Sequence, residues 1–127
     1  MSARILVVED EEALTTLLRY NLDAEGYDVE TVARGDDADT RLKERVPDLI
    51  VLDFLMPGLN GIEAAREIVR ASPNVPIMLC TMYLSPQLLD LAKNAGVTGT
   101  LSKSNLGQLI PGIETILSGS TYFSPAS

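Results

Sequence analysis

The chain has 127 residues, of which 46% are hydrophobic, so it is long and apolar enough to bury the core of one ordinary domain. Its 18 acidic and 10 basic residues give a formal net charge of -8, which excludes the basic footprint that direct nucleic-acid binding needs and opposes binding to an anionic membrane. The sequence has no histidine and a single cysteine, which excludes histidine-activated nucleophiles, histidine- or thiolate-bound zinc and intrachain disulfides.

The N-terminus and the cysteine predict where the protein works. The run MSARILVVED is too short and too soon acidic for a signal peptide, and no apolar stretch approaches the roughly 18–20 residues of a membrane span. Cys80 closes the apolar run VPIMLC and is expected to be a small core residue rather than a nucleophile. Because a chain without disulfides suits a reducing compartment, a cytoplasmic location is expected.

Short apolar runs alternate with longer amphipathic segments along the chain. In chain order, the expected strands are RILVV (4–8), YDVETV (27–32), DLIVLD (48–53), VPIMLCT (75–81) and VTGTLS (97–102). The expected helices are 11–25, 35–46, 60–71, 85–96 and 105–118. Such strict alternation of nearly continuous apolar strands with helices predicts an α/β fold, a doubly wound five-stranded parallel sheet with helices on both faces.

Local signals mark the ends of the helices. Gly26 is expected at the C-terminal end of the first helix and Gly96 at the end of the fourth. Ser85 is the expected N-cap of the fourth helix, with Pro86 at its first helical position. Within the first helix, the residues at helical spacing are Leu14, Leu17, Leu18 and Leu22.

The C-terminal region carries one ambiguity and one expected boundary. Pro111 falls inside the fifth helix, where a proline removes a hydrogen bond and clashes with the preceding turn. Either that helix kinks, or a short turn runs from Asn105 and the main helix begins at Pro111. The serine-rich stretch 121–127 is expected to be the start of a linker or a tail that follows a domain of residues 1–120.

Polar residues follow the predicted strands at the carboxyl edge of the sheet, where open parallel sheets bind ligands. They are Glu9, Asp10, Asp53, Thr81 and Lys103. Taken singly, most have a local explanation, as a helix cap (Asp10), a turn residue (Asp53), a β-branched strand residue (Thr81) or a solvated charge (Lys103). The convergence of four strand ends on one edge favours a functional site.

The charges of this edge predict what it binds. Clustered Glu9, Asp10 and Asp53 would repel one another unless a cation or Lys103 compensates. Because the available ligands are oxygens, Mg2+, Ca2+ and Mn2+ are the candidate metals. Mg2+ suits the site best, since it takes one or two carboxylates and shares the oxygens of a phosphate. Glu11 and Glu12 are expected to complement the positive end of the first helix instead.

The motifs ILVVEDE, PDLIVLDFLMPGLNGIE, VPIMLCT and LSKS resemble the receiver domain of two-component response regulators over essentially the whole chain. The resemblance implies a flavodoxin-like sheet of order 2-1-3-4-5, in which the Pro-Gly pair at 57–58 turns the chain. It implies that Asp53 accepts a phosphoryl group from a phosphohistidine of a sensor histidine kinase. The groups that it implies around this phosphoryl group are Mg2+ held by Glu9, Asp10, Asp53 and the backbone carbonyl of Leu55, a hydrogen bond from Thr81 and an ion pair with Lys103.

The ending IETILSGSTYFSP resembles receivers that carry a C-terminal helix-turn-helix DNA-binding domain. Either the chain is an excised receiver or it works alone; we expect the first, with control of an attached or partner DNA-binding output. Its own activity is expected to be at most weak self-phosphorylation and self-dephosphorylation, not ordinary enzymatic turnover. The fourth helix, fifth strand and fifth helix are the expected output face. Leu88, Leu91 or Ile110 are the candidates for a homodimer contact there, although core packing is the alternative expected for most of them.

Three positions depart from the family pattern. Thr100 stands where receivers usually have Tyr or Phe, Met82 where a small residue follows the switch threonine, and Ser104 where a proline or an acid follows the lysine. Tyr83 is a candidate substitute for the missing aromatic. These departures favour a second interpretation, an atypical receiver that acts as a protein–protein interaction module with little phosphate dependence. A flavodoxin-like enzyme or cofactor carrier is disfavoured, because no phosphate-cradling glycine loop follows the first strand.

Overall fold

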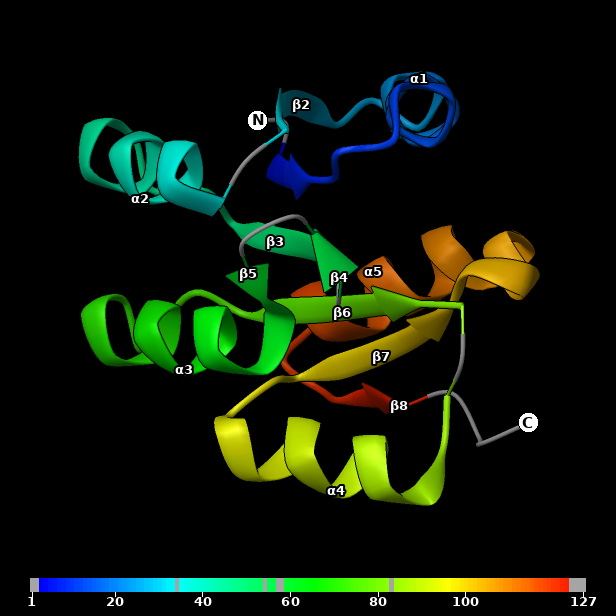
Figure 1. Ribbon diagram of the computed structural model, residues 1–127. Helices are drawn as coiled ribbons and strands as arrows, with labels where there is room; N and C mark the ends of the chain where they lie inside the picture. The colour runs from blue at the N-terminus through cyan, green and yellow to red at the C-terminus, as the bar shows by residue number, and fades with distance from the viewer. Residues whose placement is uncertain (1–2, 34, 54, 57–58, 83, 124–127) are drawn as a thin grey trace.

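The computed structural model describes residues 3–33, 35–53, 55–56, 59–82 and 84–123 (Figure 1). Its strands are β1 (Arg4–Val8), β2 (Asp28–Val32), β3 (Leu49–Asp53), β4 (Leu55–Met56), β5 (Leu59–Asn60), β6 (Ile77–Thr81), β7 (Gly99–Ser102) and β8 (Tyr122–Phe123). Its helices are α1 (Glu12–Ala24), α2 (Gly35–Glu44), α3 (Gly61–Ala71), α4 (Pro86–Ala95), the 3-10 helix η1 (Lys103–Gln108) and α5 (Leu109–Leu117).

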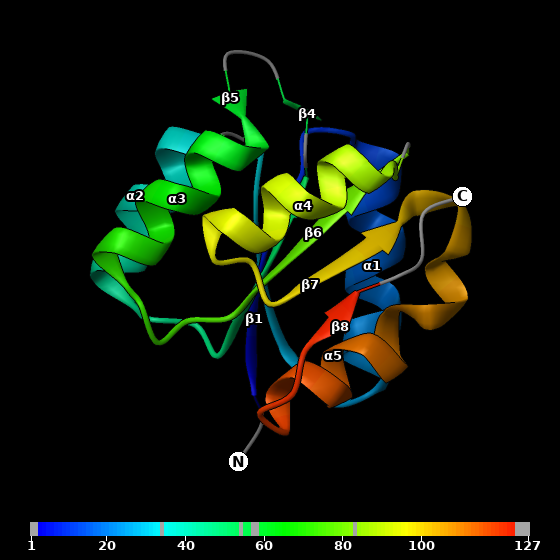
Figure 2. The ribbon, with the colours of Figure 1, turned by 90° about the horizontal axis from the view of Figure 1, so that it is seen from below.

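The central sheet is parallel throughout and has the order β2-β1-β3-β6-β7-β8. The first five of these are the five predicted strands, so the doubly wound fold and the order 2-1-3-4-5 are confirmed. Figure 2 shows α1 and α5 on one side of the sheet and α2, α3 and α4 on the other. Because both faces are covered, every residue of β3 and β6 is buried, which explains why both strands are apolar up to their last residues, Asp53 and Thr81.

The predicted ends of α1 and α4 are confirmed by their cap geometry. The Ser85 hydroxyl accepts a hydrogen bond from the Leu88 backbone N–H at 3.1 Å, and Pro86 is the first residue of α4. Gly26 and Gly96 follow the two helices with φ of 88° and 92°. This left-handed conformation strains other L-residues, so glycine is the residue that ends both helices.

The structure resolves the ambiguity at Pro111 in favour of an interrupted segment. The short helix η1 comes first, with non-helical dihedrals at Asn105, and α5 begins at Leu109. Pro111 therefore lies in the first turn of α5, which begins two residues before the start that the second alternative predicts. Proline is tolerated in that turn because the N–H that it lacks would have no partner within the helix.

Three features differ from the sequence-based expectation or extend it. Tyr122 and Phe123, which fall in the expected tail, form a sixth strand on the outer edge of β7. Leu17 shares its spacing with the core leucines of α1 but is 46% exposed. The strands β4 and β5 form an antiparallel pair, and the Pro-Gly turn expected at 57–58 lies outside the described residues.

In the part of the chain that the structure describes, no helix has the length and apolar character to cross a membrane.

Candidate functional site

The carboxyl ends of four parallel strands meet at one edge of the sheet. The registers pair Val8 of β1 with Leu52 of β3, Asp53 with Cys80 of β6, and Thr81 with Ser102 of β7. The residues that follow these pairs are therefore neighbours in space. They line a pocket of about 220 Å³ formed by Glu9, Asp10, Glu11, Asp53, Thr81, Met82 and Lys103. The five polar residues predicted from the strand ends thus lie together.

Lys103 bridges two buried carboxylates in this pocket. Its Nζ lies 2.9 Å from Glu9 Oε1 and 2.9 Å from Asp53 Oδ1. The side chain of Lys103 is 11% exposed, while Glu9 and Asp53 are 4% and 5% exposed. Because this ion pair is largely removed from water, salt screens it only weakly. The two carboxylates therefore hold the ammonium in place.

Three carboxylates converge around this ammonium. Ligand oxygens of Glu9, Asp10 and Asp53 all lie within 4.8 Å of one another, with Asp10 exposed and the other two buried. Three carboxylates against one ammonium leave a surplus of two negative charges when all are ionised. A compact set of hard oxygen donors with excess negative charge is the ligand chemistry that Mg2+ takes, so these residues fit such an ion.

Burial and ion pairing act in opposite directions on the groups of the pocket. Burial raises the pKa of Glu9 above its ordinary value and outweighs the hydrogen bonds from Lys103 and the Glu11 backbone. Burial alone would lower the pKa of Lys103, but its hydrogen bonds to Asp53 and Glu9 outweigh that effect and raise it. Burial raises the pKa of Cys80 to about 12. Cys80 is therefore an inert core thiol, as the sequence predicts.

The chain around Glu9 is held by short-range hydrogen bonds. The Glu11 backbone N–H donates to Glu9 Oε2 at 3.1 Å, and the Thr15 hydroxyl donates to the Glu9 carbonyl at 3.3 Å. Glu11 is the N-cap residue of α1 and makes no side-chain cap. The local explanation of Asp10 as the helix cap is therefore wrong, which leaves its exposed carboxylate available to the pocket.

Sequence reasoning missed Ser102, which is buried next to Lys103. Its hydroxyl oxygen accepts a hydrogen bond from the Ser104 backbone N–H at 3.2 Å and lies 2.6 Å from Ser104 Oγ. These contacts cap η1 and fix the backbone on both sides of Lys103. The available signal was a serine two residues before another polar residue at a strand end, the pattern of a serine turn.

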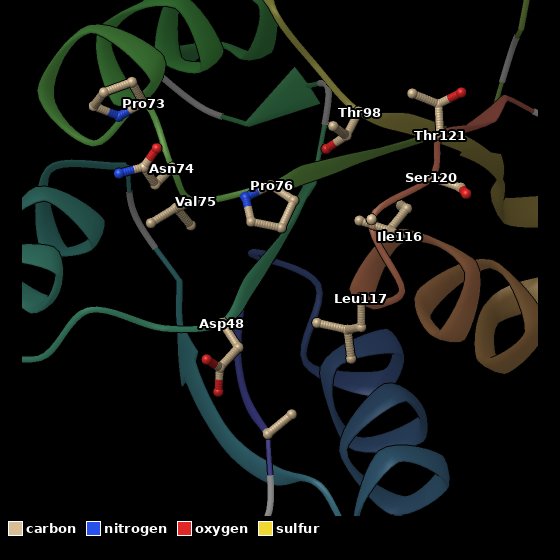
Figure 3. A pocket seen from close by; sticks show the side chains of 12 residues that line it. Asp48, Pro73, Asn74, Val75, Pro76, Thr98, Ile116, Leu117, Ser120 and Thr121 are labelled. Carbon is tan, nitrogen blue, oxygen red and sulfur yellow. The ribbon is translucent and has the colours of Figure 1, made fainter.

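A larger hollow of about 730 Å³ lies at the opposite, amino edge of the sheet (Figure 3). Asp48 is the charged residue among those that line it, and its carboxylate accepts a hydrogen bond from the Arg4 backbone N–H at 2.7 Å. The other lining side chains include Pro76, Ile116 and Leu117. This hollow gathers no set of charged groups, so the chemistry of the described residues concentrates at the carboxyl edge.

Comparison with known proteins agrees with this geometry. Residues 5–113 match the family described as the response regulator receiver domain. The chain belongs to this family. Receivers are signalling domains that sensor histidine kinases phosphorylate.

Among curated relatives, the receiver is 54% identical over 84 residues to the phosphate regulon transcriptional regulatory protein PhoB of Rhizobium meliloti (strain 1021), covering 64% of this chain and 37% of that protein. It is 44% identical over 81 residues to the alkaline phosphatase synthesis transcriptional regulatory protein PhoP of Bacillus subtilis (strain 168), covering 64% and 34%. The receiver thus spans about a third of the length of these relatives.

Solved structures share the fold over nearly the whole receiver. A two-component response regulator of the LuxR family from Aurantimonas sp. SI85-9A1 superposes with a TM-score of 0.92 at 32% identity, covering 98% of this chain and 91% of that one. The chemotaxis protein CheY4 of Vibrio cholerae gives 0.84 at 29% identity, covering 90% and 98%.

The residues that depart from the receiver pattern occupy different environments. Met82 lies at the pocket and is 54% exposed. Thr100 is fully buried in β7, away from the pocket, and its Oγ1 has no hydrogen-bond partner among the described residues. Tyr83 lies outside the described residues, so its suggested role stays a prediction. Leu55 is described as the first residue of β4, two positions after Asp53.

Proposed function

We propose that this receiver is a phosphorylation-dependent switch of the cytoplasm, in which Asp53 accepts a phosphoryl group from a phosphohistidine of a sensor histidine kinase. The observation that carries the proposal is the position of Asp53. It is 5% exposed, lies 2.9 Å from the Lys103 ammonium and belongs to the three-carboxylate cluster at the carboxyl edge. A buried carboxylate in such a setting is a candidate nucleophile with a defined physical reason.

The transfer itself exchanges one phosphorus bond for another. A carboxylate oxygen of Asp53 attacks phosphorus, the new O–P bond forms as the N–P bond to the histidine breaks, and the imidazole nitrogen keeps the electron pair. The product is an aspartyl phosphate. Lys103, already held against Asp53, pairs with the incoming phosphoryl oxygens. Catalysis then consists of positioning and charge neutralisation, as in phosphoryl transfer generally.

The acidic cluster is the proposed site of a divalent ion beside the phosphoryl group. Glu9, Asp10, Asp53 and the backbone carbonyl of Leu55 are the groups that would hold Mg2+, and the ion would neutralise negative charge on the phosphoryl oxygens. Thr81 ends β6 at the same pocket and is proposed to donate a hydrogen bond to a phosphoryl oxygen. The same groups would support slow self-phosphorylation and self-dephosphorylation.

Intact mass spectrometry after incubation with acetyl phosphate and Mg2+ tests this proposal. We expect the mass to rise by one phosphoryl group and the Asp53→Asn variant to show no rise. Asp48→Asn is the matched control, because Asp48 lies at the opposite edge of the sheet and should leave the reaction intact. A wild-type chain that stays unmodified, or a fully modified Asp53→Asn variant, would remove Asp53 from its role.

The output is proposed from the relatives. Two of them are named as transcriptional regulatory proteins, and the receiver spans about a third of their length. We therefore propose that residues 1–120 are the phosphoacceptor domain of a longer regulator, with residues from 121 onward leading to a DNA-binding output. Homodimerisation through α4, β7 and α5 fits Leu91, which is 46% exposed, better than Leu88, which is buried in the core.

The second candidate function, a phosphate-independent interaction module, is favoured by one observation. Thr100 is buried where receivers usually carry an aromatic residue, so the usual aromatic reporter is missing from β7. Analytical ultracentrifugation with and without beryllofluoride and Mg2+ separates the two functions. A change in oligomeric state supports the switch, and an unchanged state in a chain that binds beryllofluoride supports the module.

A further inference from the structure

The C-terminal strand β8 contacts both elements that lead out of the phosphoacceptor pocket. Its two residues pair with Gly99 and Thr100 of β7, and β7 runs directly into Lys103. On the other side, the Lys93 ammonium of α4 lies 5.0 Å from the centroid of the Phe123 ring. Since α4 follows the loop that begins at Thr81, β8 is joined to the pocket by two routes.

The direction of β8 returns the chain to the reaction edge. The helix α5 ends at Leu117, close to the amino edge of the sheet, where Leu117 lines the hollow of Figure 3. Because β8 is parallel to β7, the chain then runs back toward the carboxyl edge, as Figure 2 shows. Across the sheet, Phe123 is level with Thr100, Leu79 and Leu52, the residue before Asp53.

Two glycines allow β8 to pack closely against β7 and α5. A Cβ on Gly99 would lie 2.6 Å from the Tyr122 carbonyl oxygen, and a Cβ on Gly112 would lie 3.0 Å from the Tyr122 ring. Any larger residue at position 99 would therefore push β8 away from β7. The Tyr122 backbone N–H donates to the Thr98 carbonyl at 3.1 Å, and the Tyr122 hydroxyl donates to Gln108 Oε1 at 3.3 Å.

The pairing of β8 with β7 is short and lies beside an unsatisfied buried hydroxyl. The ladder has only two residue pairs, and Thr100, which pairs with Phe123, is fully buried with no partner for its hydroxyl among the described residues. A buried hydroxyl without a hydrogen bond is destabilising, because it has given up its bonds to water. Lifting Phe123 away from β7 would open the outer side of Thr100 to water. The docked strand is therefore held by few contacts and opposed by one unsatisfied group.

We propose that β8 is a strap, docked on β7 while Asp53 is unmodified and released when Asp53 carries a phosphoryl group. This inference rests on the proposed function of Asp53. A phosphoryl group adds a charge of about -1.5 to -2 next to Lys103, whose ammonium is held by Asp53 and Glu9. Lys103, which directly follows β7, pairs with this group in place of the Asp53 carboxylate, and the change in its position shifts the end of the strand on which β8 is docked. The change of charge at Asp53 thereby releases β8 from β7.

Amide hydrogen exchange followed by NMR, with intact mass measured on the same sample, tests the strap. The Tyr122 N–H reports the outer side of β7, whereas the Thr98 N–H, which donates to the Ile77 carbonyl at 3.0 Å, reports the inner side. On phosphorylation with acetyl phosphate and Mg2+, we expect exchange at Tyr122 to rise about tenfold or more and exchange at Thr98 to stay unchanged. Full phosphorylation with unchanged or slower exchange at Tyr122 overturns the strap alone, whereas absence of the added mass overturns the proposed function of Asp53.

Two variants probe how firmly the strap is docked before phosphorylation. Phe123→Ala removes the contact with Lys93, so we expect fast exchange at Tyr122 before phosphorylation, while the added mass at Asp53 is retained. Thr100→Val removes the unsatisfied hydroxyl at nearly constant shape, so we expect exchange at Tyr122 to slow about fivefold or more. A Phe123→Ala chain with wild-type exchange, or a Thr100→Val chain with faster exchange, contradicts the strap.

Discussion

The Lys103 ammonium lies 2.9 Å from Asp53 and 2.9 Å from Glu9, so one buried cation holds two carboxylates that come from different strands. The raised pKa of Lys103 means that its stabilising contribution is present below the ordinary value of 10.5 and is lost only as the pH rises through the folded value. At neutral pH this ammonium is therefore fully available to the acidic cluster.

Replacing Lys103 by methionine should destabilise the fold and slow phosphorylation of Asp53. Two buried carboxylates would lose their shared cation, at a cost of about 3–5 kcal/mol at neutral pH. The cost should be smaller near pH 4, because burial raises the pKa of Glu9 and a protonated Glu9 no longer needs the cation. Urea unfolding at both pH values measures this, with the exposed Lys43→Met on α2 as the control. Equal destabilisation at both pH values would contradict the electrostatic explanation.

Glu9→Gln should stabilise the metal-free protein at pH 7. Burial raises the pKa of Glu9 above its ordinary value of 4.5. A raised folded pKa means that the protonated form stabilises the fold; this contribution is fully present below 4.5 and is lost as the pH rises through the folded value. Ionised Glu9 is thus unfavourable at pH 7, and a neutral amide of the same shape removes that cost.

The comparison is the urea midpoint of wild type and Glu9→Gln at pH 7 and near pH 4, without divalent ions. The difference in urea midpoint between Glu9→Gln and wild type should be smaller at the lower pH, where wild-type Glu9 is itself protonated. Glu63→Gln, exposed in the first turn of α3, should leave the midpoint unchanged at both pH values. A lower midpoint for Glu9→Gln at pH 7 would show that the ion pair with Lys103 outweighs burial.

Mg2+ should raise the thermal stability of the wild-type chain. An ion that binds only the folded state adds about 2.7 kcal/mol at a concentration one hundred times its dissociation constant. The gain should be lost in Asp10→Asn, because Asp10 belongs to the three-carboxylate cluster, and kept in Asp23→Asn on α1. Differential scanning calorimetry with and without EDTA measures the shift. An Asp10→Asn chain that responds to Mg2+ like wild type would place the ion elsewhere.

Thr100→Val and Thr98→Val should change stability in opposite directions, although the two positions are only two residues apart in the chain. Thr100 Oγ1 has no partner among the described residues, so its removal should stabilise by about 1–3 kcal/mol. Thr98 Oγ1 accepts from the Ile77 N–H at 2.9 Å and donates to the Ile77 carbonyl at 3.1 Å, so its removal should destabilise. Thermal unfolding of both variants tests this, and a shift of the same sign in both would refute the assignment.

The exposed apolar surface of α1 should matter for the protein partner and not for a small phosphodonor. Leu17 is 46% exposed and Tyr20 is 72% exposed on the helix that begins beside Asp10. The two side chains are three residues apart on one helix, and we expect them to contact a protein partner. Leu17→Asp with Tyr20→Ser should slow transfer from the sensor kinase at least about tenfold and leave the reaction with acetyl phosphate unchanged. An equal loss with both donors would instead indicate a folding defect.

Much of the fold could be predicted because its signals are local. The strands β3 and β6 are buried on both faces, so their sequences are apolar up to the last residue, and Ser85 and Gly96 mark the ends of α4 by their own chemistry. The strand β8 carries no such signal. Its two residues can pack against β7 because Gly99 has no side chain, and this close approach exists only in the packed sheet.

The candidate site divides in the same way. The sequence by itself determined which chemical groups the strand ends carry: carboxylates at Glu9, Asp10 and Asp53 and an ammonium at Lys103. Only the tertiary structure decided that one ammonium bridges two of those carboxylates, and that the Thr100 hydroxyl is buried with no partner among the described residues. The physical reason is that residue type and periodicity are properties of short segments, whereas distances between side chains depend on the register of strands that lie far apart in the chain.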